Sequence, residues 1–250
     1  MNAAIKPLKA QSLSDSFVKS MERLILSGRL AIGERLPSER ELAQIMNVSR
    51  PVVHEGLVEL ARLGLVKQKP RVGAVVNDYR RDGSVALLNT LLEYTSAEIE
   101  PNLLASLLDM RELLEVEIAR LAARNRRGEH LQALARLVQE ESARTNASPW
   151  ELAETDFTFH HQLALAGGNI VYPLLLNSFR PVIANLSSIF YARQRVVRDV
   201  FRFHSELLEA INKKDAEAAS LVMRKLIRHG RRHLYKSFPV VNEKRREEET

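Results

Sequence analysis

Apolar residues recur at helical spacing near the start of the chain, beginning with a run over Leu13–Leu26 that stops before Gly28. A second helix is expected to begin at Ser38, because a serine followed three residues later by Glu41 forms a capping box. Asn47 is expected to end this helix. The apolar side chains on its buried face are expected to be those of Leu42, Ile45 and Met46.

A third helix is predicted over 49–63, with Ser49 as its cap and Pro51 in its first turn, where a missing N–H group costs nothing. Short extended runs at 66–68 and 74–76 then favour a β-hairpin. Three helices followed by a hairpin are the layout of a winged helix-turn-helix, which places its last helix in the DNA major groove. The exposed N-terminal end of that helix carries Ser49, Arg50, Pro51, Val52 and His54.

Beyond residue 84 the chain has helical periodicity and no strand pattern. Helices are predicted over 84–94, 101–125, 129–145, 149–166, 171–192, 196–212 and 216–235. Such helices form an all-α bundle with room for an internal pocket. The expected fold is mainly α, with a winged helix-turn-helix domain over 1–78, a linker over 79–84, an all-α effector-binding and dimerisation domain over 85–238 and a disordered charged tail over 239–250.

Positive charge is concentrated in the N-terminal part. Residues 1–80 hold 13 Lys and Arg against 8 Asp and Glu, which accounts for +5 of the net charge of +6. A basic module beside a near-neutral one favours a polyanion-binding domain joined to another function. The chain has no Cys, which excludes disulfides and thiolate metal sites, and no apolar run typical of a signal peptide or a membrane span. We therefore expect a cytoplasmic protein.

Two segments carry specific motifs, Leu36-Pro-Ser-Glu-Arg-Glu-Leu-Ala43 and Val48-Ser-Arg-Pro-Val-Val-His-Glu-Gly-Leu57. They resemble the DNA-binding domain of the GntR family of bacterial transcription regulators, and the likeness covers about 12–76. The resemblance implies DNA contacts by Arg40, Ser49, Arg50, Pro51, Val52 and His54, and by Lys69 and Arg71 at the tip of the wing.

Two positions depart from the family pattern. The family usually has Arg where this chain has His54, and the first Gly of its Gly-x-Gly wing is Arg71 here. These departures concern how the DNA is read, so the chain is expected to bind DNA with an operator preference of its own.

A second group of residues points to metal chemistry. Asp156 and His160 are four residues apart and so share one helical face, and His204 lies in a later predicted helix. A carboxylate with imidazoles suits Zn, Ni or Mn. An aspartate and a histidine at this spacing are also common as plain hydrogen-bonded partners. The same three residues could instead form the catalytic metal site of a metal-dependent hydrolase.

The helical half resembles the effector domain of the FadR subfamily of GntR regulators. The resemblance places Asp156, His160 and His204 at metal-ligand positions for one divalent ion per subunit, and Arg111 at the position of a pocket arginine that meets an acidic effector. The fourth ligand of that pattern, a histidine, falls on Leu226, and His229 lies about one turn further along.

Other segments favour a different ligand. Residues 87–94, 101–111 and 168–177 resemble the fatty-acid regulators of this subfamily, which bind long-chain acyl-CoA without metal. In that case Leu226 would line an apolar tunnel.

The sequence thus predicts a homodimeric regulator, a repressor and not an enzyme, that binds a palindromic double-stranded operator. Its expected effector is a small carboxylate with metal assistance, with acyl-CoA as the alternative. No membrane partner is expected, and an architectural DNA-binding protein without a pocket is the remaining alternative class.

Overall fold

The structure is a computed structural model that describes residues 13–69, 72–94, 101–144 and 147–237. The chain divides into two compact units, Met1–Tyr94 and Thr95–Thr250. The predicted tail over 239–250 and the wing residue Arg71 lie outside the described residues. Within the described ranges, no helix combines the length and apolar character needed to cross a bilayer.

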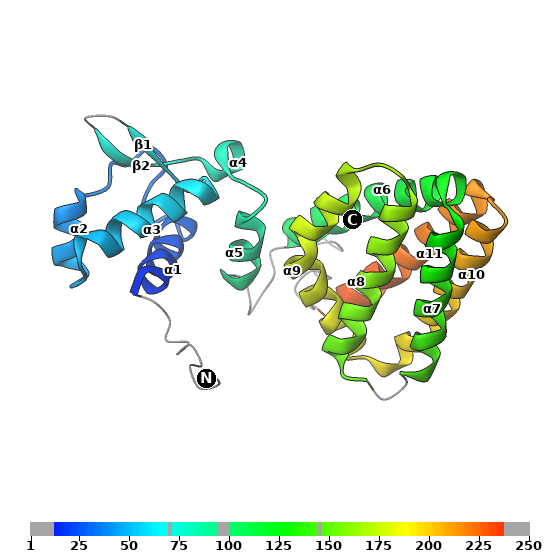
Figure 1. The fold of residues 1–250 in the computed structure, drawn as a ribbon. Coiled ribbons are helices and arrows are strands. Elements are labelled where there is room, and N and C mark those ends of the chain that lie inside the picture. The colour runs from blue at the N-terminus through cyan, green and yellow to red at the C-terminus, as the bar shows by residue number, and fades with distance from the viewer. Residues whose placement is uncertain (1–12, 70–71, 95–100, 145–146, 238–250) are drawn as a thin grey trace, which may run out of the picture. The chain divides into compact units, whose positions relative to one another are not determined.

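The first unit is a winged helix-turn-helix, as the sequence predicts (Figure 1). In chain order its elements are α1 (Leu13–Leu26), α2 (Glu39–Ile45), α3 (Arg50–Leu63), β1 (Val66–Lys69), β2 (Gly73–Val76), α4 (Tyr79–Asp82) and α5 (Leu87–Tyr94). The two strands pair antiparallel, from Val66 opposite Val76 to Lys69 opposite Gly73. The predicted capping box at the start of α2 is present, with the hydroxyl of Ser38 accepting from the Glu41 N–H and the Glu41 carboxylate accepting from the Ser38 N–H.

The core of the first unit lies between α1 and α3. Phe17 of α1 is 1% exposed and packs against Gly56 of α3, where an added Cβ would stand 2.3 Å from the ring. Glycine therefore permits the close approach of the two helices. The expectation for α2 is only partly correct, because Leu42 is buried whereas Ile45 is 70% exposed. Met46, the C-cap residue of α2, is partly buried against the same core, so Ile45 alone among the three expected residues is exposed.

The segment expected to be a linker is part of the first unit. Residues 79–82 form α4, and its first residue, Tyr79, packs on the same core as Leu87 and Leu91 of α5. The backbone of this segment also closes on the end of α3, since a Cβ at Gly64 would meet the Asp82 carbonyl at 2.1 Å. The expected boundary at 79–84 is therefore corrected, because the division between the compact units falls after Tyr94.

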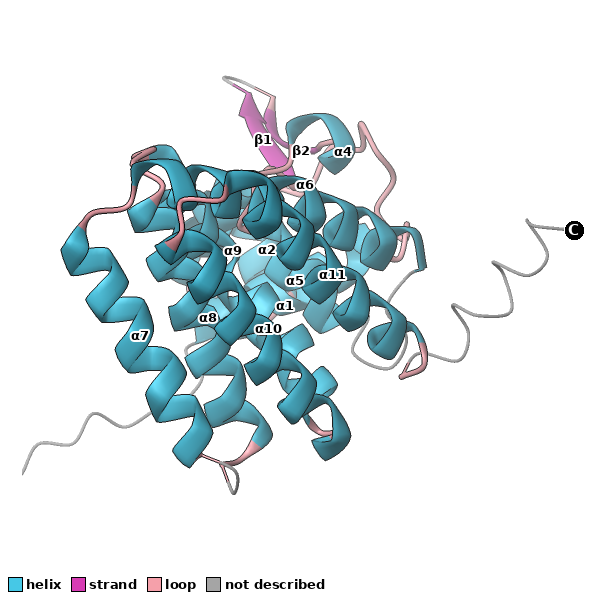
Figure 2. Cartoon of the chain, turned by 90° about the vertical axis from the view of Figure 1, so that its right-hand side faces the viewer, coloured by secondary structure: helices cyan, strands magenta, loops and turns pink. Residues whose placement is uncertain are grey.

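The second unit is all-α in its described residues, which agrees with the expected helical bundle. Figure 2 shows helices throughout it, whereas the magenta strands belong to the hairpin of the first unit. Its elements are α6 (Pro101–Asn125), α7 (Gly128–Ala143), α8 (Pro149–Ala166), α9 (Val171–Tyr191), the 3₁₀ helix η1 (Gln194–Val196), α10 (Val197–Asn212) and α11 (Ala216–Tyr235).

Helix α8 packs against α6, α7 and α9. Local sequence sets its start, because Ser148 forms a capping box with Glu151 and Pro149 occupies the first turn. Its buried residues share one side of the helix, among them Leu152, Ala153, Phe157, Phe159 and Leu163, whereas Glu151, Thr158 and Leu165 on the other side are exposed. Asp156 and His160 belong to the buried side, so their polar side chains point into the protein interior.

Candidate functional site

The N-terminal end of α3 is an exposed basic surface. Arg50, Pro51 and His54 are exposed, and Val52 is half-buried. Ser49 takes the N-cap position but makes no side-chain capping bond, which corrects the expected cap and leaves its exposed hydroxyl without a helix contact. A helix N-terminus attracts phosphate, and an arginine beside it can bind a phosphate or a guanine edge through two donors.

Helix α2 supports this surface through His54. The Nδ1 atom of His54 lies 2.8 Å from the Oε1 atom of Glu39 on α2. Since this contact occupies Nδ1, the Nε2 atom is the ring nitrogen left to meet a partner. Arg40 of α2 is exposed as well. The structure thus gathers on α2 and the start of α3 the helical residues that the family resemblance assigns to DNA.

The hairpin is anchored beside the segment that precedes α2. The Leu36 N–H donates to the Ala74 carbonyl at 2.9 Å, and Arg35 forms a β-bridge with Val75. At the tip Lys69 is exposed, and Gly73 has a φ of 95°, a value that side chains disfavour. The second glycine of the wing pattern therefore keeps its conformational role despite the departure two residues earlier.

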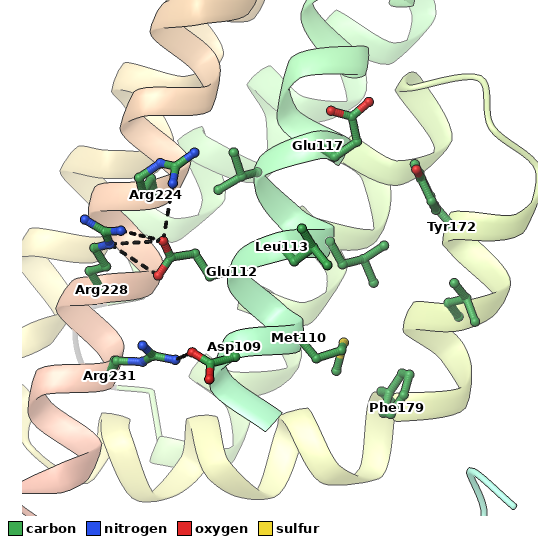
Figure 3. Close-up of a pocket in the computed structure, with 13 residues that line it drawn as sticks. Asp109, Met110, Glu112, Leu113, Glu117, Tyr172, Phe179, Arg224, Arg228 and Arg231 are labelled. Carbon is green, nitrogen blue, oxygen red and sulfur yellow. Dashed lines mark hydrogen bonds and ion pairs between the residues drawn. The ribbon is translucent and has the colours of Figure 1, made fainter. Parts of the chain in front are cut away.

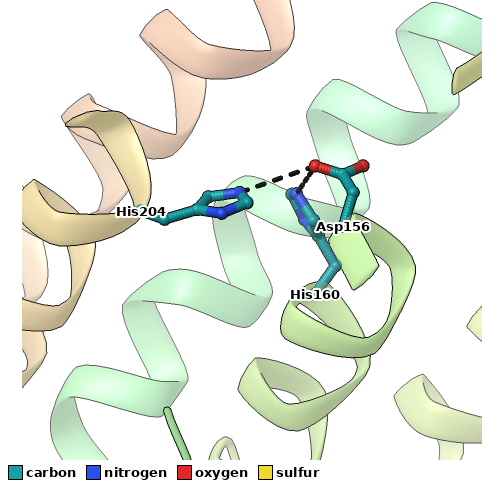
Figure 4. Close-up of side chains that lie close together, drawn as sticks. All are labelled: Asp156, His160 and His204. Atoms are coloured by element: carbon teal, nitrogen blue, oxygen red, sulfur yellow. Dashed lines mark ion pairs between the residues drawn. The ribbon is translucent and has the colours of Figure 1, made fainter. Parts of the chain in front are cut away.

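A cluster of titratable side chains is buried in the second unit (Figure 4). Asp156 and His160 lie on successive turns of α8 and His204 lies on α10, with exposed fractions of 7%, 4% and 0%. One donor atom from each residue lies within 4.8 Å of the others. The Nε2 atoms of His160 and His204 are 3.7 and 3.6 Å from the same Oδ1 atom of Asp156. The structure thus brings together the three residues that the sequence proposes as ligands.

Two glutamates orient the imidazole rings. Glu141 of α7 accepts from Nδ1 of His204, with a separation of 2.8 Å, and Glu115 of α6 contacts Nδ1 of His160. Both glutamates are 1% exposed. A carboxylate on the outer nitrogen of a metal-bound histidine fixes the ring and directs the other nitrogen at the ion. Both rings here have this arrangement.

The separations between the three side chains fit a divalent ion. Distances of 3.6 and 3.7 Å are too long for hydrogen bonds. They are close to the spacing of about 3.4 Å between neighbouring ligand atoms around a tetrahedral ion bound at about 2.1 Å. In addition, the buried Nε2 atom of His204 has no hydrogen-bond partner in the described part of the chain. The cluster could therefore hold a metal ion.

Electrostatic contacts within the cluster set its protonation states. Burial alone would raise the pKa of Glu115, but the charges of Arg111 and His160 outweigh burial and lower that pKa to about 2. Burial likewise favours neutral His160, but Glu115 and Asp156 outweigh it and raise the pKa of this imidazole. Burial and the adjacent Asp156 raise the pKa of Tyr191 well above its usual value, so its hydroxyl stays protonated and donates to Oδ1 of Asp156 at 2.9 Å.

Arg111, the expected effector contact, is engaged inside the protein. Its Nε atom donates to Oε1 of Glu115 at 2.6 Å, and its side chain is 11% exposed. Glu115, Glu141 and Tyr191 are further residues of the cluster, beyond those predicted from the sequence. The spacing of four residues between Arg111 and Glu115 could have predicted their ion pair. No local spacing could have predicted Glu141 and Tyr191, because they reach the cluster from other helices.

The expected position of a fourth histidine ligand is apolar. Leu226 of α11 is 5% exposed and lines the same small cavity as Asp156 and His160. His229 lies elsewhere, with its Nε2 atom 3.8 Å from a carboxylate oxygen of Asp199 and its ring against Phe190 and Phe203. It does not belong to the three-residue group, so the described ligand set ends with one carboxylate and two imidazoles.

The second unit also has an open groove of about 1020 Å³, whereas the cavity beside the cluster measures about 30 Å³. Figure 3 shows the groove along α6, with Arg224 and Arg228 of α11 facing Glu112 on one side and Tyr172 and Phe179 of α9 on the other. The small cavity has the volume of about one water molecule. A small acid therefore needs a smaller separation of the surrounding helices than a bulkier ligand does.

Both parts of the chain match known families. Residues 13–76 match the family described as "Bacterial regulatory proteins, gntR family", and residues 106–229 match the one described as "FCD domain". Among solved structures, that of Lar, which controls the expression of the Listeria monocytogenes agr system, aligns with a TM-score of 0.61. It is 18% identical and covers 91% of this chain and 99% of its own, a likeness that shows the fold.

Curated relatives match over most of their length. The HTH-type transcriptional regulator Mce2R of Mycobacterium tuberculosis is 30% identical over 232 residues, 90% of this chain and 92% of that protein. The Glc operon transcriptional activator of Escherichia coli K12 is 30% identical over 231 residues, 87% of each. The fatty acid metabolism regulator protein of Shewanella oneidensis is 29% identical over 189 residues, 76% of each.

Proposed function

The chain belongs to the GntR family of bacterial transcription regulators, with an FCD effector domain, and we propose that it is a homodimeric repressor that a small carboxylate releases from a palindromic operator. One observation carries the proposal. The same chain combines an exposed basic end of α3 with a buried cluster of histidines and carboxylates beside a small cavity. The first suits DNA, and the second suits an organic acid.

The DNA contacts are assigned to α2, α3 and the wing. Arg50 and Ser49 meet the phosphates or bases at the N-terminal end of α3, with Pro51, Val52 and His54 beside them. Arg40 approaches from α2, and Lys69 and Arg71 from the wing. One such DNA-binding domain contacts one half-site, and a dimer with two of these domains recognises a palindromic operator. Light scattering of the purified chain, alone and with DNA, tests the dimer.

In the effector domain, Asp156, His160 and His204 would hold one divalent ion, Zn, Ni or Mn. The ion would supply a Lewis-acid centre whose remaining coordination positions accept a carboxylate oxygen. Glu115 and Glu141 keep both imidazoles turned toward Asp156. Arg111 compensates the buried charge of Glu115. The effector must bind one arrangement of the domain better than the other, since only differential affinity shifts the equilibrium.

A fatty acyl-CoA effector is the second candidate. It is favoured by apolar Leu226 at the fourth-ligand position and by the similarity to the Shewanella fatty acid metabolism regulator. The cavity volume of about 30 Å³ favours the small acid. Relatives named as transcriptional regulators favour both candidates over a metal-dependent hydrolase.

The test has two parts. An operator is first selected from random double-stranded DNA, and its release by small carboxylates and by acyl-CoA is then followed by fluorescence anisotropy. Elemental analysis and mass spectrometry of the purified protein identify a bound metal or a co-purified acyl-CoA. Failure to select any DNA, or release by neither ligand class, would overturn the proposal.

A further inference from the structure

Arg231 of α11 forms the wall between the small cavity and the open groove. It is among the residues that line both spaces. A terminal nitrogen of its guanidinium pairs with Asp109 of α6, whose side chain is 70% exposed (Figure 3). The Nε atom of Arg231, by contrast, is buried and has no hydrogen-bond partner in the described chain. A buried donor without an acceptor is costly, so this N–H group is suited to a ligand.

The other charged groups around the cavity have partners. Arg111 donates to Glu115, and Asp156 accepts from Tyr191. His160 contacts Glu115 through Nδ1. Of the two arginines that line the cavity, Arg231 is the one with a buried donor that lacks an acceptor among the described residues.

The remaining walls are mostly apolar. They include Leu108, Phe190, Val200, Leu226, Ile227 and Leu234. Gly230 completes the lining from α11, and a Cβ built on it has no atom within 4 Å. Glycine inside a helix lowers helix stability, yet here it leaves open space beside the cavity. A ligand that exceeds the cavity could extend through this space.

We propose that Arg231 binds the carboxylate of the effector, and that the effector is a short monocarboxylic acid with an apolar remainder. The carboxylate lies against Nε of Arg231 in the small cavity, and the apolar part extends along Leu226 and Ile227 past Gly230. This inference rests on the proposed function, in which the helical unit binds a small carboxylate. It narrows the acid to one with an apolar remainder, because the part of the wall next to Arg231 on α11 is formed by Leu226, Ile227 and Leu234.

Binding should also loosen a contact on α6. A carboxylate grips a guanidinium most firmly through two parallel N–H groups. The bound acid would therefore compete with Asp109 for the guanidinium of Arg231. Removing that competition with Asp109→Asn should tighten acid binding, whereas removing the donor with Arg231→Gln should weaken it.

The experiment measures binding of butyrate, hexanoate and phenylacetate to the full chain by calorimetry and by the shift in Tm. Glycolate and lactate serve as hydroxylated comparisons. We expect the apolar acids to bind best, Arg231→Gln to weaken them roughly 10- to 100-fold and Asp109→Asn to strengthen them. Arg228→Gln is the matched control, because Arg228 lies on the same helix, is 60% exposed and does not line the cavity.

Gly230→Leu should abolish binding of the acids, because the new side chain would fill the space beside the cavity. Gly128→Leu, at an exposed helix start, should leave acid binding unchanged.

Each outcome separates this inference from the proposed function. If no acid binds the wild-type chain, the proposed carboxylate response itself is wrong. If the acids bind wild type and folded Arg231→Gln equally, the assignment of Arg231 is wrong while the carboxylate response stands. If glycolate or lactate binds more tightly than hexanoate, the apolar class is wrong. Should Arg231→Gln fail to fold, unchanged binding by both Asp109→Asn and Gly230→Leu would overturn the inference.

Discussion

The Oε1 atom of Glu141 lies 2.8 Å from Nδ1 of His204, and this contact turns the opposite ring nitrogen of His204 toward Asp156. Because Glu141 is on α7 and His204 on α10, the packing of two helices determines how the imidazole points. An orienting carboxylate of this kind strengthens a metal site without touching the ion.

We predict that Glu141→Gln lowers the affinity for Zn²⁺ roughly 10- to 100-fold, because an amide orients and polarises the imidazole less than a carboxylate does. Calorimetric titration of the metal-free protein measures this effect. Glu140→Gln is the control, since Glu140 is the preceding residue on α7 and its side chain is 57% exposed. Equal Zn²⁺ affinities for wild type and Glu141→Gln would contradict the role of Glu141.

Leu226→His is predicted to raise Zn²⁺ affinity by about tenfold or more, because a third imidazole beside Asp156 would complete a four-ligand set. Competition with a chromophoric chelator gives the two affinities. Leu221→His, on the exposed side of α11 with Leu221 54% exposed, controls for an added histidine. The same affinity for both variants would mean that position 226 does not face the ion.

Arg50→Ala is predicted to weaken operator binding by about 1–3 kcal/mol if Arg50 contacts a base edge. If Arg50 contacts a phosphate instead, the slope of log K against the logarithm of the salt concentration should become smaller in magnitude by about one. Fluorescence anisotropy at several salt concentrations separates the two cases. Arg62→Ala is the control, because Arg62 lies at the opposite end of α3 and pairs with Glu59 at 2.6 Å. An Arg50→Ala protein with wild-type affinity and salt slope would exclude Arg50 from the interface.

Ser148→Ala should destabilise the protein by about 1 kcal/mol near neutral pH, because it removes the cap of α8. Hydrogen bonds from Ser148 lower the pKa of Glu151 below 4.5, so the stabilisation by this contact is present above pH 4.5 and is lost as the pH falls below it. Denaturant unfolding of both proteins between pH 3 and 7 should therefore show their difference narrowing in acid. Ser178→Ala, at an exposed position inside α9, should change stability little. A difference that grows in acid would contradict this account.

Local signals predicted most element boundaries. Ser38 and Ser148 start helices because the capping box involves atoms only three residues apart. Gly64 ends α3 with a φ of 82° for an equally local reason. The expected linker over 79–84 differs from these elements. Its polar, Gly-containing sequence did not indicate that Tyr79, and Leu87 just after it, pack on the core of the first unit.

The winged helix-turn-helix, the helical second unit and the shared face of Asp156 and His160 could be predicted from the sequence, since all three follow from local spacing along the chain. Tertiary packing was needed to bring His204 to the group, to surround it with Glu115, Glu141 and Tyr191, and to keep His229 apart. Packing also engages Nε of Arg111 with Glu115 and leaves the buried Nε of Arg231 without an acceptor among the described residues. The physical reason is that the rotation of each helix about its axis depends on packing with distant helices, which no local pattern specifies.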